Sequence, residues 1–143
     1  MATVVDESGA IPGAREACRR AAEAVLGARK VVVAIVDDAT IAELHERYLG
    51  VEGATDVLSF PHGEIVVSAE TAQREARERR IDPRSELCLY VVHGALHLKG
   101  FDDRTPRARS RMRAEERRIL GRLGLGDIFG TAAKVAGARR RRG

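Results

Sequence analysis

The segment from about residue 83 to residue 99 constrains the fold most, because it predicts a helix that is apolar around most of its circumference. Asp82 followed by Pro83 is typical of a helix start, as an N-cap and a first-turn proline. Gly100 lies just past the expected end, where a left-handed C-cap is common. The apolar residues of the segment are Leu87, Leu89, Tyr90, Val91, Val92, Leu96 and Leu98. A helix that is apolar all round is usually buried, so we expect this one to be the central helix of the core.

Three other stretches predict β-structure. Residues 30–37 form a continuous run of mainly β-branched apolar residues, which is typical of a buried strand covered on both faces. Residues 56–60 and 64–68 are short strand-like runs joined by a Pro-His-Gly turn, so they predict a hairpin. Residues 2–6 are β-branched as well and could add an edge strand.

More polar helices are expected between and after these strands. The helix that follows the buried strand is expected to be capped by Asp38 or Thr40. That helix has one apolar face, formed by Ile41, Leu44, Tyr48 and Leu49. A length of 143 residues without internal repeats fits one domain, which we expect to span residues 1–130. The other predicted helices outside the central one cover residues 14–28, 69–80 and 106–123.

Charge and cysteine content limit the class of protein. The net charge of +4 equals the charge of the four consecutive arginines at 139–142, so residues 131–143 are expected to form a basic, mobile tail. Such a tail is either a solvated end or a contact for nucleic acid or another polyanion. Cys18 and Cys88 lack metal-site or redox spacing, so they are expected to be buried, reduced thiols. With no signal peptide and no long apolar run, the chain is expected to be cytoplasmic and not membrane-bound.

His93 and His97 stand four residues apart in the central helix, on one face, so both imidazoles can bind one ion. An HxxxH pair alone is a weak indication, because most such pairs bind nothing. It is strengthened here by the cost of burying two uncommitted histidines in an apolar helix. In addition, the turn at Gly100 can bring Asp103 back to the same face. These three residues predict a zinc site whose fourth position is open to water, which is the arrangement of catalytic zinc.

The residue after the first histidine is Gly94, where zinc peptidases of the HExxH class carry their glutamate general base. Peptide hydrolysis is therefore less favoured than hydrolysis of a substrate that already carries charge. Zinc can itself lower the pKa of bound water to near 7. We therefore expect His93 and His97 to act in catalysis through the metal-bound water.

At this segment the sequence resembles the bacterial YbeY family of rRNA maturation factors. Residues 93–103 read HGALHLKGFDD, against the family signature HGxLHLxGYDH, and residues 54–61 read ATDVLSFP, against PTDVLSFP. The strand signature GDIVIS is matched by GEIVVS at 63–68. The resemblance covers roughly residues 30–124, and its late helix is matched by Met112, Glu116, Ile119 and Leu120.

The resemblance implies a single α+β domain with a small mixed sheet packed against helices, among them the zinc-bearing helix. It also implies a zinc-dependent, single-strand-specific endoribonuclease with one Zn²⁺ per chain. The implied partners are rRNA and the small ribosomal subunit, through 16S rRNA 3′-end maturation and ribosome quality control. Because the chain has few aromatic residues, recognition by base stacking is disfavoured, and ribosomal context would supply specificity.

Two positions depart from the family pattern. The third histidine of the family is replaced by Asp103, whose oxygen is an accepted zinc ligand, while Asp102 is expected to support the turn or orient a ligand. The family's YRG segment reads Tyr-Leu-Gly, so Leu49 stands where an arginine assists phosphate handling. Arg47 is a candidate substitute in catalysis and RNA binding, although residues two apart on a helix point in different directions.

The remaining polar residues receive simpler interpretations. Loop and strand packing roles are expected for Thr55, Asp56, Ser59 and Phe60. His45 and His62 are expected to be surface or loop residues and not ligands. Lys99 and Arg104 flank the metal turn, as solvated surface or as a basic rim that holds RNA backbone. Two alternatives to the nuclease stay open: a ribosome-assembly binding factor with weak or no catalysis, and a peptidase-like metallohydrolase.

Overall fold

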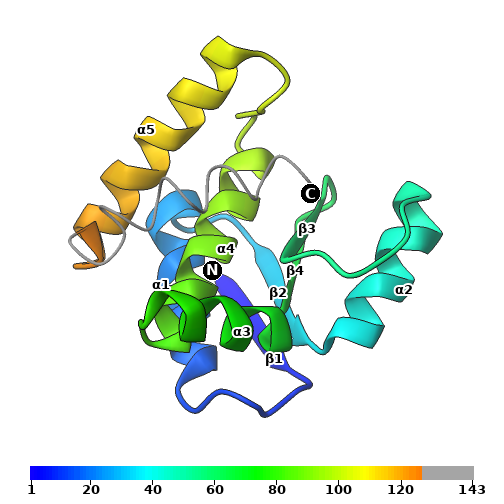
Figure 1. The fold of residues 1–143 in the computed structure, drawn as a ribbon. Coiled ribbons are helices and arrows are strands. Elements are labelled where there is room, and N and C mark those ends of the chain that lie inside the picture. Colours follow the sequence, from blue (N-terminus) through cyan, green and yellow to red (C-terminus); the bar gives the residue numbers. More distant parts are fainter. Residues whose placement is uncertain (127–143) are drawn as a thin grey trace.

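The computed structural model describes residues 1–126, and these form five helices and four strands (Figure 1). The expected tail at 131–143, like residues 127–130, lies outside the described residues. Helices and strands lie where the sequence patterns place them, and the ends of those with predicted bounds differ by two residues at most. In chain order they are β1 (Ala2–Asp6), α1 (Ala14–Leu26), β2 (Val31–Val36), α2 (Asp38–Leu49), β3 (Val57–Phe60), β4 (Glu64–Ser68), α3 (Ala69–Arg79), α4 (Pro83–Leu98) and α5 (Pro106–Arg122).

The four strands form one mixed sheet in the order β1-β2-β4-β3. β1 and β4 both pair with β2 in parallel, and β3 pairs with β4 antiparallel across the predicted hairpin. β1 is an edge strand, as its short β-branched sequence predicted. The expected α+β class with a small mixed sheet is therefore confirmed.

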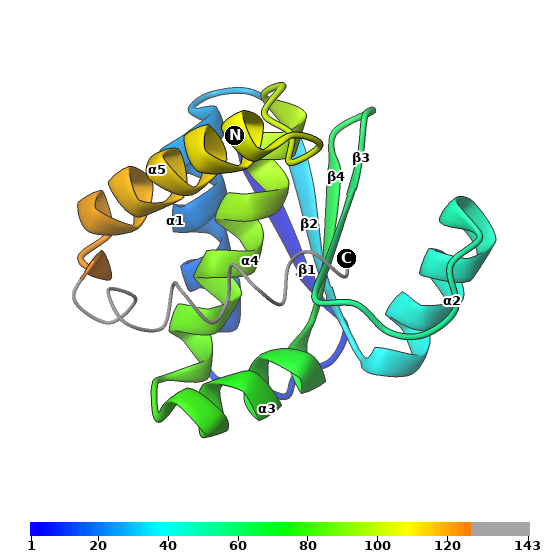
Figure 2. The same ribbon diagram turned by 45° about the horizontal axis from the view of Figure 1, so that its top comes forward.

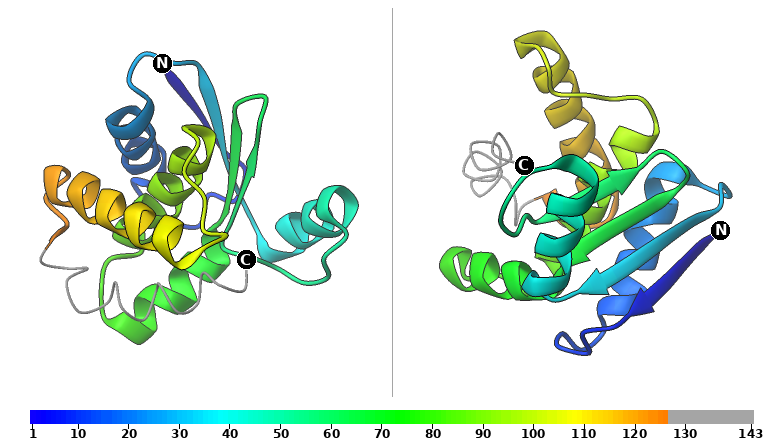
Figure 3. Two further views of the ribbon diagram at one scale, coloured as in Figure 1. Left: turned by 90° about the horizontal axis from the view of Figure 1, so that it is seen from above. Right: turned by 90° about the vertical axis from the view of Figure 1, so that its right-hand side faces the viewer.

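The helices lie on both sides of the sheet (Figures 2 and 3). α1, α4 and α5 lie on one side and α2 on the other, while α3 packs against α4 and, less extensively, against α2. The main core fills the space between the sheet and α1 and α4. A smaller cluster beneath α2 consists of Ala34, Val36, Ile41, Leu58 and Val66.

α4 is the central helix, as predicted, and its residues from Ser85 to Leu96 are all buried. Asp82 caps it by accepting a hydrogen bond from the Arg84 backbone N–H at 2.8 Å, with Pro83 in the first turn. At its start Glu86 is fully buried and forms an ion pair with Arg79 of α3. α4 is thereby fixed both by apolar packing and by a charged contact with the preceding helix.

Two local expectations were wrong. β2 is not covered along its whole length, because Val32 is 41% exposed and the small α2 cluster covers only the later part of the strand. The N-cap of α2 is Asp37, whose Oδ1 accepts from the Thr40 N–H at 2.8 Å. Asp38 instead faces α3. Its partial burial raises the pKa of the carboxyl group, but hydrogen bonds from Ser68, Arg74 and Thr71 lower it more. The pKa of Asp38 therefore lies below its usual value.

Both cysteines are buried, free thiols, as expected. Burial raises the pKa of Cys88 to about 11 and that of Cys18 further. Among residues 1–126, no helix has the length and apolar character needed to cross a bilayer.

Candidate metal centre

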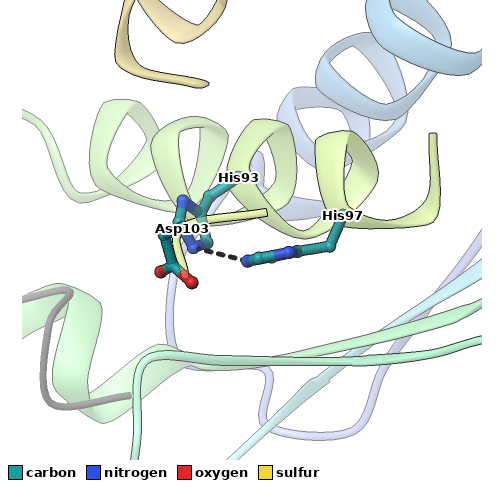
Figure 4. A group of neighbouring side chains, drawn as sticks. All are labelled: His93, His97 and Asp103. Carbon is teal, nitrogen blue, oxygen red and sulfur yellow. Dashed lines mark hydrogen bonds between the residues drawn. The ribbon is translucent and has the colours of Figure 1, made fainter. Parts of the chain in front are cut away.

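The C-terminal half of α4 places His93 and His97 one turn apart, with their Nε2 atoms 3.1 Å from each other. The two rings meet nearly at right angles, with centroids 4.7 Å apart. His93 is buried and His97 half-buried. The two histidines predicted to form a pair therefore point toward each other, with their Nε2 atoms in contact, as Figure 4 shows.

The other nitrogen of each ring is held by an acceptor. His97 Nδ1 lies 3.1 Å from the carbonyl oxygen of Phe101, which can only accept, so Nδ1 of His97 carries the hydrogen. His93 Nδ1 lies 2.6 Å from Oε2 of Glu116, and a carboxylate likewise accepts. In a ring whose single hydrogen lies on Nδ1, Nε2 carries a lone pair, and the two Nε2 atoms lie 3.1 Å apart.

Asp103 joins the two histidines because the chain turns sharply after α4. Gly100 has a φ of 105°, which disfavours residues with a side chain, and the Phe101 N–H returns to the Leu96 carbonyl at 3.0 Å. One ligand atom from each of His93, His97 and Asp103 lies within 4.8 Å of the others. The three residues thus form a possible metal-binding triad, in the arrangement that the turn at Gly100 predicted.

The donor set fits a divalent metal ion. Two nitrogens bound tetrahedrally to zinc at about 2.0–2.1 Å would lie about 3.3 Å apart, close to the 3.1 Å between the Nε2 atoms. A hydrogen bond between two such lone-pair atoms would need an extra proton on the pair, and a bound cation would take the place of that proton. Two imidazoles with one carboxylate suit zinc and also other first-row divalent ions.

Gly94 is required by packing. A Cβ at this position would lie 2.9 Å from Ile65 Cγ2, 2.9 Å from Ser59 Oγ and 3.0 Å from Val57 Cγ2, closer than such contacts allow. Ser59 Oγ also donates a hydrogen bond to the Gly94 carbonyl at 2.9 Å. The space that a glutamate side chain would need at this position, as in HExxH peptidases, is therefore filled by side chains of the sheet. Ser59 packs within β3 and also links α4 to the sheet through its hydrogen bond.

Residues proposed to contact RNA lie in two separate places. Lys99 and Arg104 are exposed and flank the metal turn, where the Asp102 carboxylate accepts from the Arg104 N–H at 3.0 Å and supports the turn. Arg47 is exposed in the last turn of α2, on the opposite side of the sheet from α4 (Figures 2 and 3). Leu49, at the same end of α2, is 59% exposed.

The other histidines are not part of the triad. His62 is an exposed turn residue beside Glu64, as expected. The surface or loop placement of His45 was wrong: it lies within α2, is buried, and its Nδ1 is 3.0 Å from the Gly53 carbonyl. Thr55 is buried in the loop before β3, and the Asp56 carbonyl accepts from the Ser68 N–H, so both contribute to this connection.

The residue that sequence reasoning missed is Glu116, which holds His93. A signal was available in α5, where a charged residue interrupts an otherwise apolar stripe. The buried residues of α5 are Met112, Glu116, Ile119 and Leu120. Arg109, also in α5, donates from Nη1 to the backbone carbonyl of Asp103 at 3.1 Å. α5 therefore contacts the triad at two of its three residues.

The chain is similar to known proteins of one family. A family model described as Endoribonuclease YbeY matches residues 14–124. The Endoribonuclease YbeY of Rhodopirellula baltica is 43% identical over 117 residues, which cover 73% of this chain and 60% of the relative. That of Moorella thermoacetica is 38% identical over 124 residues, covering 73% of this chain and 80% of the relative.

A solved structure shares the fold. The solution structure of TM1509 from Thermotoga maritima matches with a TM-score of 0.58 and 25% identity, covering 90% of this chain and 95% of that one. The chain spans 60%, 41% and 62% of the relatives from R. baltica, Myxococcus xanthus and Methylocella silvestris. Since the family model covers most of the chain and the relatives share more than a third of their aligned residues with it, this protein belongs to the YbeY endoribonuclease family.

Proposed function

We propose that this protein is a zinc-dependent endoribonuclease that cleaves single-stranded RNA. The observation that carries the proposal is the convergence of the His93 and His97 Nε2 atoms with Asp103 at the end of α4. The relatives that bear the name Endoribonuclease support RNA as the substrate class. The cellular substrate we propose is 16S rRNA, in 3′-end maturation and ribosome quality control on the small subunit in the cytoplasm.

In this proposal His93, His97 and Asp103 hold one Zn²⁺. When bound, the ion supplies Lewis acidity toward a phosphate oxygen and lowers the pKa of water that it coordinates. The Phe101 carbonyl and the Glu116 carboxylate keep both imidazoles aimed at the ion. Gly94 keeps a protein base out of the adjacent position, which suits a substrate that brings its own negative charge.

Basic side chains beside the turn would hold the RNA backbone. Lys99 and Arg104 are exposed next to the triad, and Lys99 lines a pocket together with Arg111 of α5. Arg107 adds another exposed cation in the first turn of α5. Contacts of this kind bind phosphates without reading the base sequence, so they fit a nuclease that recognises single strands.

The test uses a labelled single-stranded RNA that contains the 3′ end of the small-subunit rRNA precursor. Wild-type protein should cleave it, a chelator should stop cleavage, and added Zn²⁺ should restore it. Cleavage that persists in the His93→Ala, His97→Ala double variant would refute the proposal. A duplex RNA and a peptide of equal length serve as substrates that should remain intact.

One observation favours a second candidate, a ribosome-assembly binding factor with little catalysis. Leu49 is exposed where the family carries an arginine, and α2, whose last turn contains Arg47, lies on the other side of the sheet from α4. Retained binding to the small subunit without RNA cleavage would favour this candidate. We further propose that residues 1–130 act as one domain, because the described elements share one sheet and one main core.

A further inference from the structure

Glu116 is unusual among the charged residues of α5, because it lies on the buried stripe of the helix. It is 7% exposed, as is His93, and the two side chains meet at 2.6 Å. The neighbouring Glu115 lies on another side of α5, where it pairs with Arg118. Of these two neighbouring glutamates, Glu116 is the one whose carboxylate is buried and contacts the imidazole of His93.

Packing alone does not account for a carboxylate at this position. Burying an ionised carboxylate is costly unless it is paired and hydrogen-bonded. A Leu or Met would continue the stripe formed by Met112, Ile119 and Leu120 without that cost. The carboxylate therefore has a role that an apolar residue cannot fill. Its contact with His93 indicates that this role is to hold the imidazole.

The two imidazoles are supported unequally. His97 donates to Phe101, a neutral carbonyl in the turn that directly follows its own helix. His93 donates to a carboxylate that comes from a different helix, 23 residues further along the chain. A carboxylate is the stronger acceptor, and when paired with a ligating histidine it fixes the tautomer and increases donor strength at the other nitrogen.

We propose that Glu116 is the positioning residue of the metal centre. By accepting the Nδ1–H of His93, it keeps the ring hydrogen on Nδ1 and leaves Nε2 as the nitrogen nearest to His97 and Asp103. Arg109 assists from the same helix by holding the Asp103 carbonyl at 3.1 Å. α5 thereby sets the metal affinity of a site to which it contributes no ligand. This inference rests on the proposed metal-binding function.

The first measurement is Zn²⁺ affinity, by competition with a chromophoric chelator at fixed pH. Glu116→Gln keeps the shape and one acceptor oxygen but removes the charge, and Glu116→Leu removes the acceptor. Loss of such a partner typically weakens metal binding by about 10–100-fold. We expect Glu116→Gln near the lower end of that range and Glu116→Leu near the upper end. The matched control Glu115→Gln removes the same charge one position away and should leave the affinity unchanged.

The second measurement needs no metal. Nitrogen-15 NMR of histidine-labelled, metal-free protein reports which ring nitrogen carries the hydrogen. Wild type and Glu115→Gln should show His93 protonated at Nδ1, whereas Glu116→Leu should shift the population towards the Nε2–H tautomer. A merely structural role for Glu116 would not move this signature in a folded variant, and circular dichroism verifies the fold.

The two proposals fail in different ways. If wild type binds Zn²⁺ and both Glu116 variants bind it equally well, Glu116 is not the positioning residue and the metal-binding function stands. If wild type binds no Zn²⁺, the proposed function fails. In that case the NMR signature still decides whether Glu116 orients His93: an unchanged tautomer in Glu116→Leu would overturn the inference.

Discussion

Gly94→Ala adds one methyl group at the closest approach of α4 to the sheet, and we expect it to destabilise the protein. The new Cβ would lie 2.9 Å from both Ile65 Cγ2 and Ser59 Oγ. Carbon atoms in good contact lie about 3.5–4.0 Å apart, so α4 must move away from the strands or the neighbouring side chains must shift. Either change disturbs the helix beside His93.

The expected magnitude is the balance of three contributions. Overpacking of a well-filled core costs about 1–3 kcal/mol. Stretching the 2.9 Å hydrogen bond from Ser59 to the Gly94 carbonyl costs up to about 0.5–1.5 kcal/mol. Replacing Gly by Ala in a helix contributes about 0.8–1.0 kcal/mol in the opposite direction. The mid-points of these ranges leave a net loss of about 2 kcal/mol, or roughly 4–8 °C in Tm for a domain of this size.

The assay is thermal and urea unfolding followed by circular dichroism, with Gly121→Ala as the matched control. Gly121 also lies in a helix, but a Cβ there would meet nothing within 4 Å. Gly121→Ala should therefore gain stability, by at most about 1 kcal/mol. If Gly94→Ala is as stable as Gly121→Ala, the steric explanation of Gly94 is wrong. Gly94→Glu, which would restore the HExxH pattern, should destabilise the fold further and yield no peptidase activity.

Three other predictions follow from the described contacts. Asp103→Ala should retain less Zn²⁺ than wild type after dialysis, by elemental analysis, and equal contents would exclude Asp103 as a ligand. Because burial raises the pKa of both thiols, Cys18 and Cys88 should react with a thiol reagent at neutral pH only after unfolding, and fast labelling of native protein would contradict this. The pKa of Asp38 is lowered in the fold, so its contribution to stability is complete above the unfolded pKa and is lost as pH falls through the folded one. Asp38→Asn should thus lose stability at pH 7 and depend less on acid pH, as chemical unfolding across pH would reveal.

Local patterns predicted most of the fold. The apolar circumference of residues 83–99, the Asp82-Pro83 start and the Gly100 stop placed α4 to within a residue, because these signals depend only on neighbours in the chain. The hairpin of β3 and β4 followed from its short turn. The position of β2 between β1 and β4 is a long-range pairing, and none of these local patterns encodes it.

The site was predictable where its residues are close in sequence. His93, His97 and Asp103 lie on one helix and its following turn, so helix geometry brings them together. The contact between Glu116 and His93 depends on how α5 docks on α4, which spacing alone does not reveal. Gly94 was interpreted as a missing base, whereas its physical cause is the contact with Ile65 and Ser59. His45 stands four residues after Ile41 and so on the same face of α2, and these are the two buried residues of that helix. Its spacing could therefore have indicated that it is buried.

The order of the elements along the chain has a consequence for synthesis. Within residues 1–126 all strands precede residue 69, so the surface against which Gly94 packs is complete in sequence before α4 emerges from the ribosome. The three residues of the possible triad follow, and Glu116 comes after them. A nascent chain that ends before α5 would carry both histidines and Asp103 without the carboxylate that orients His93. If the proposed metal site forms, a chain that has emerged only as far as the turn after α4 would therefore bind the ion more weakly than a chain that includes α5.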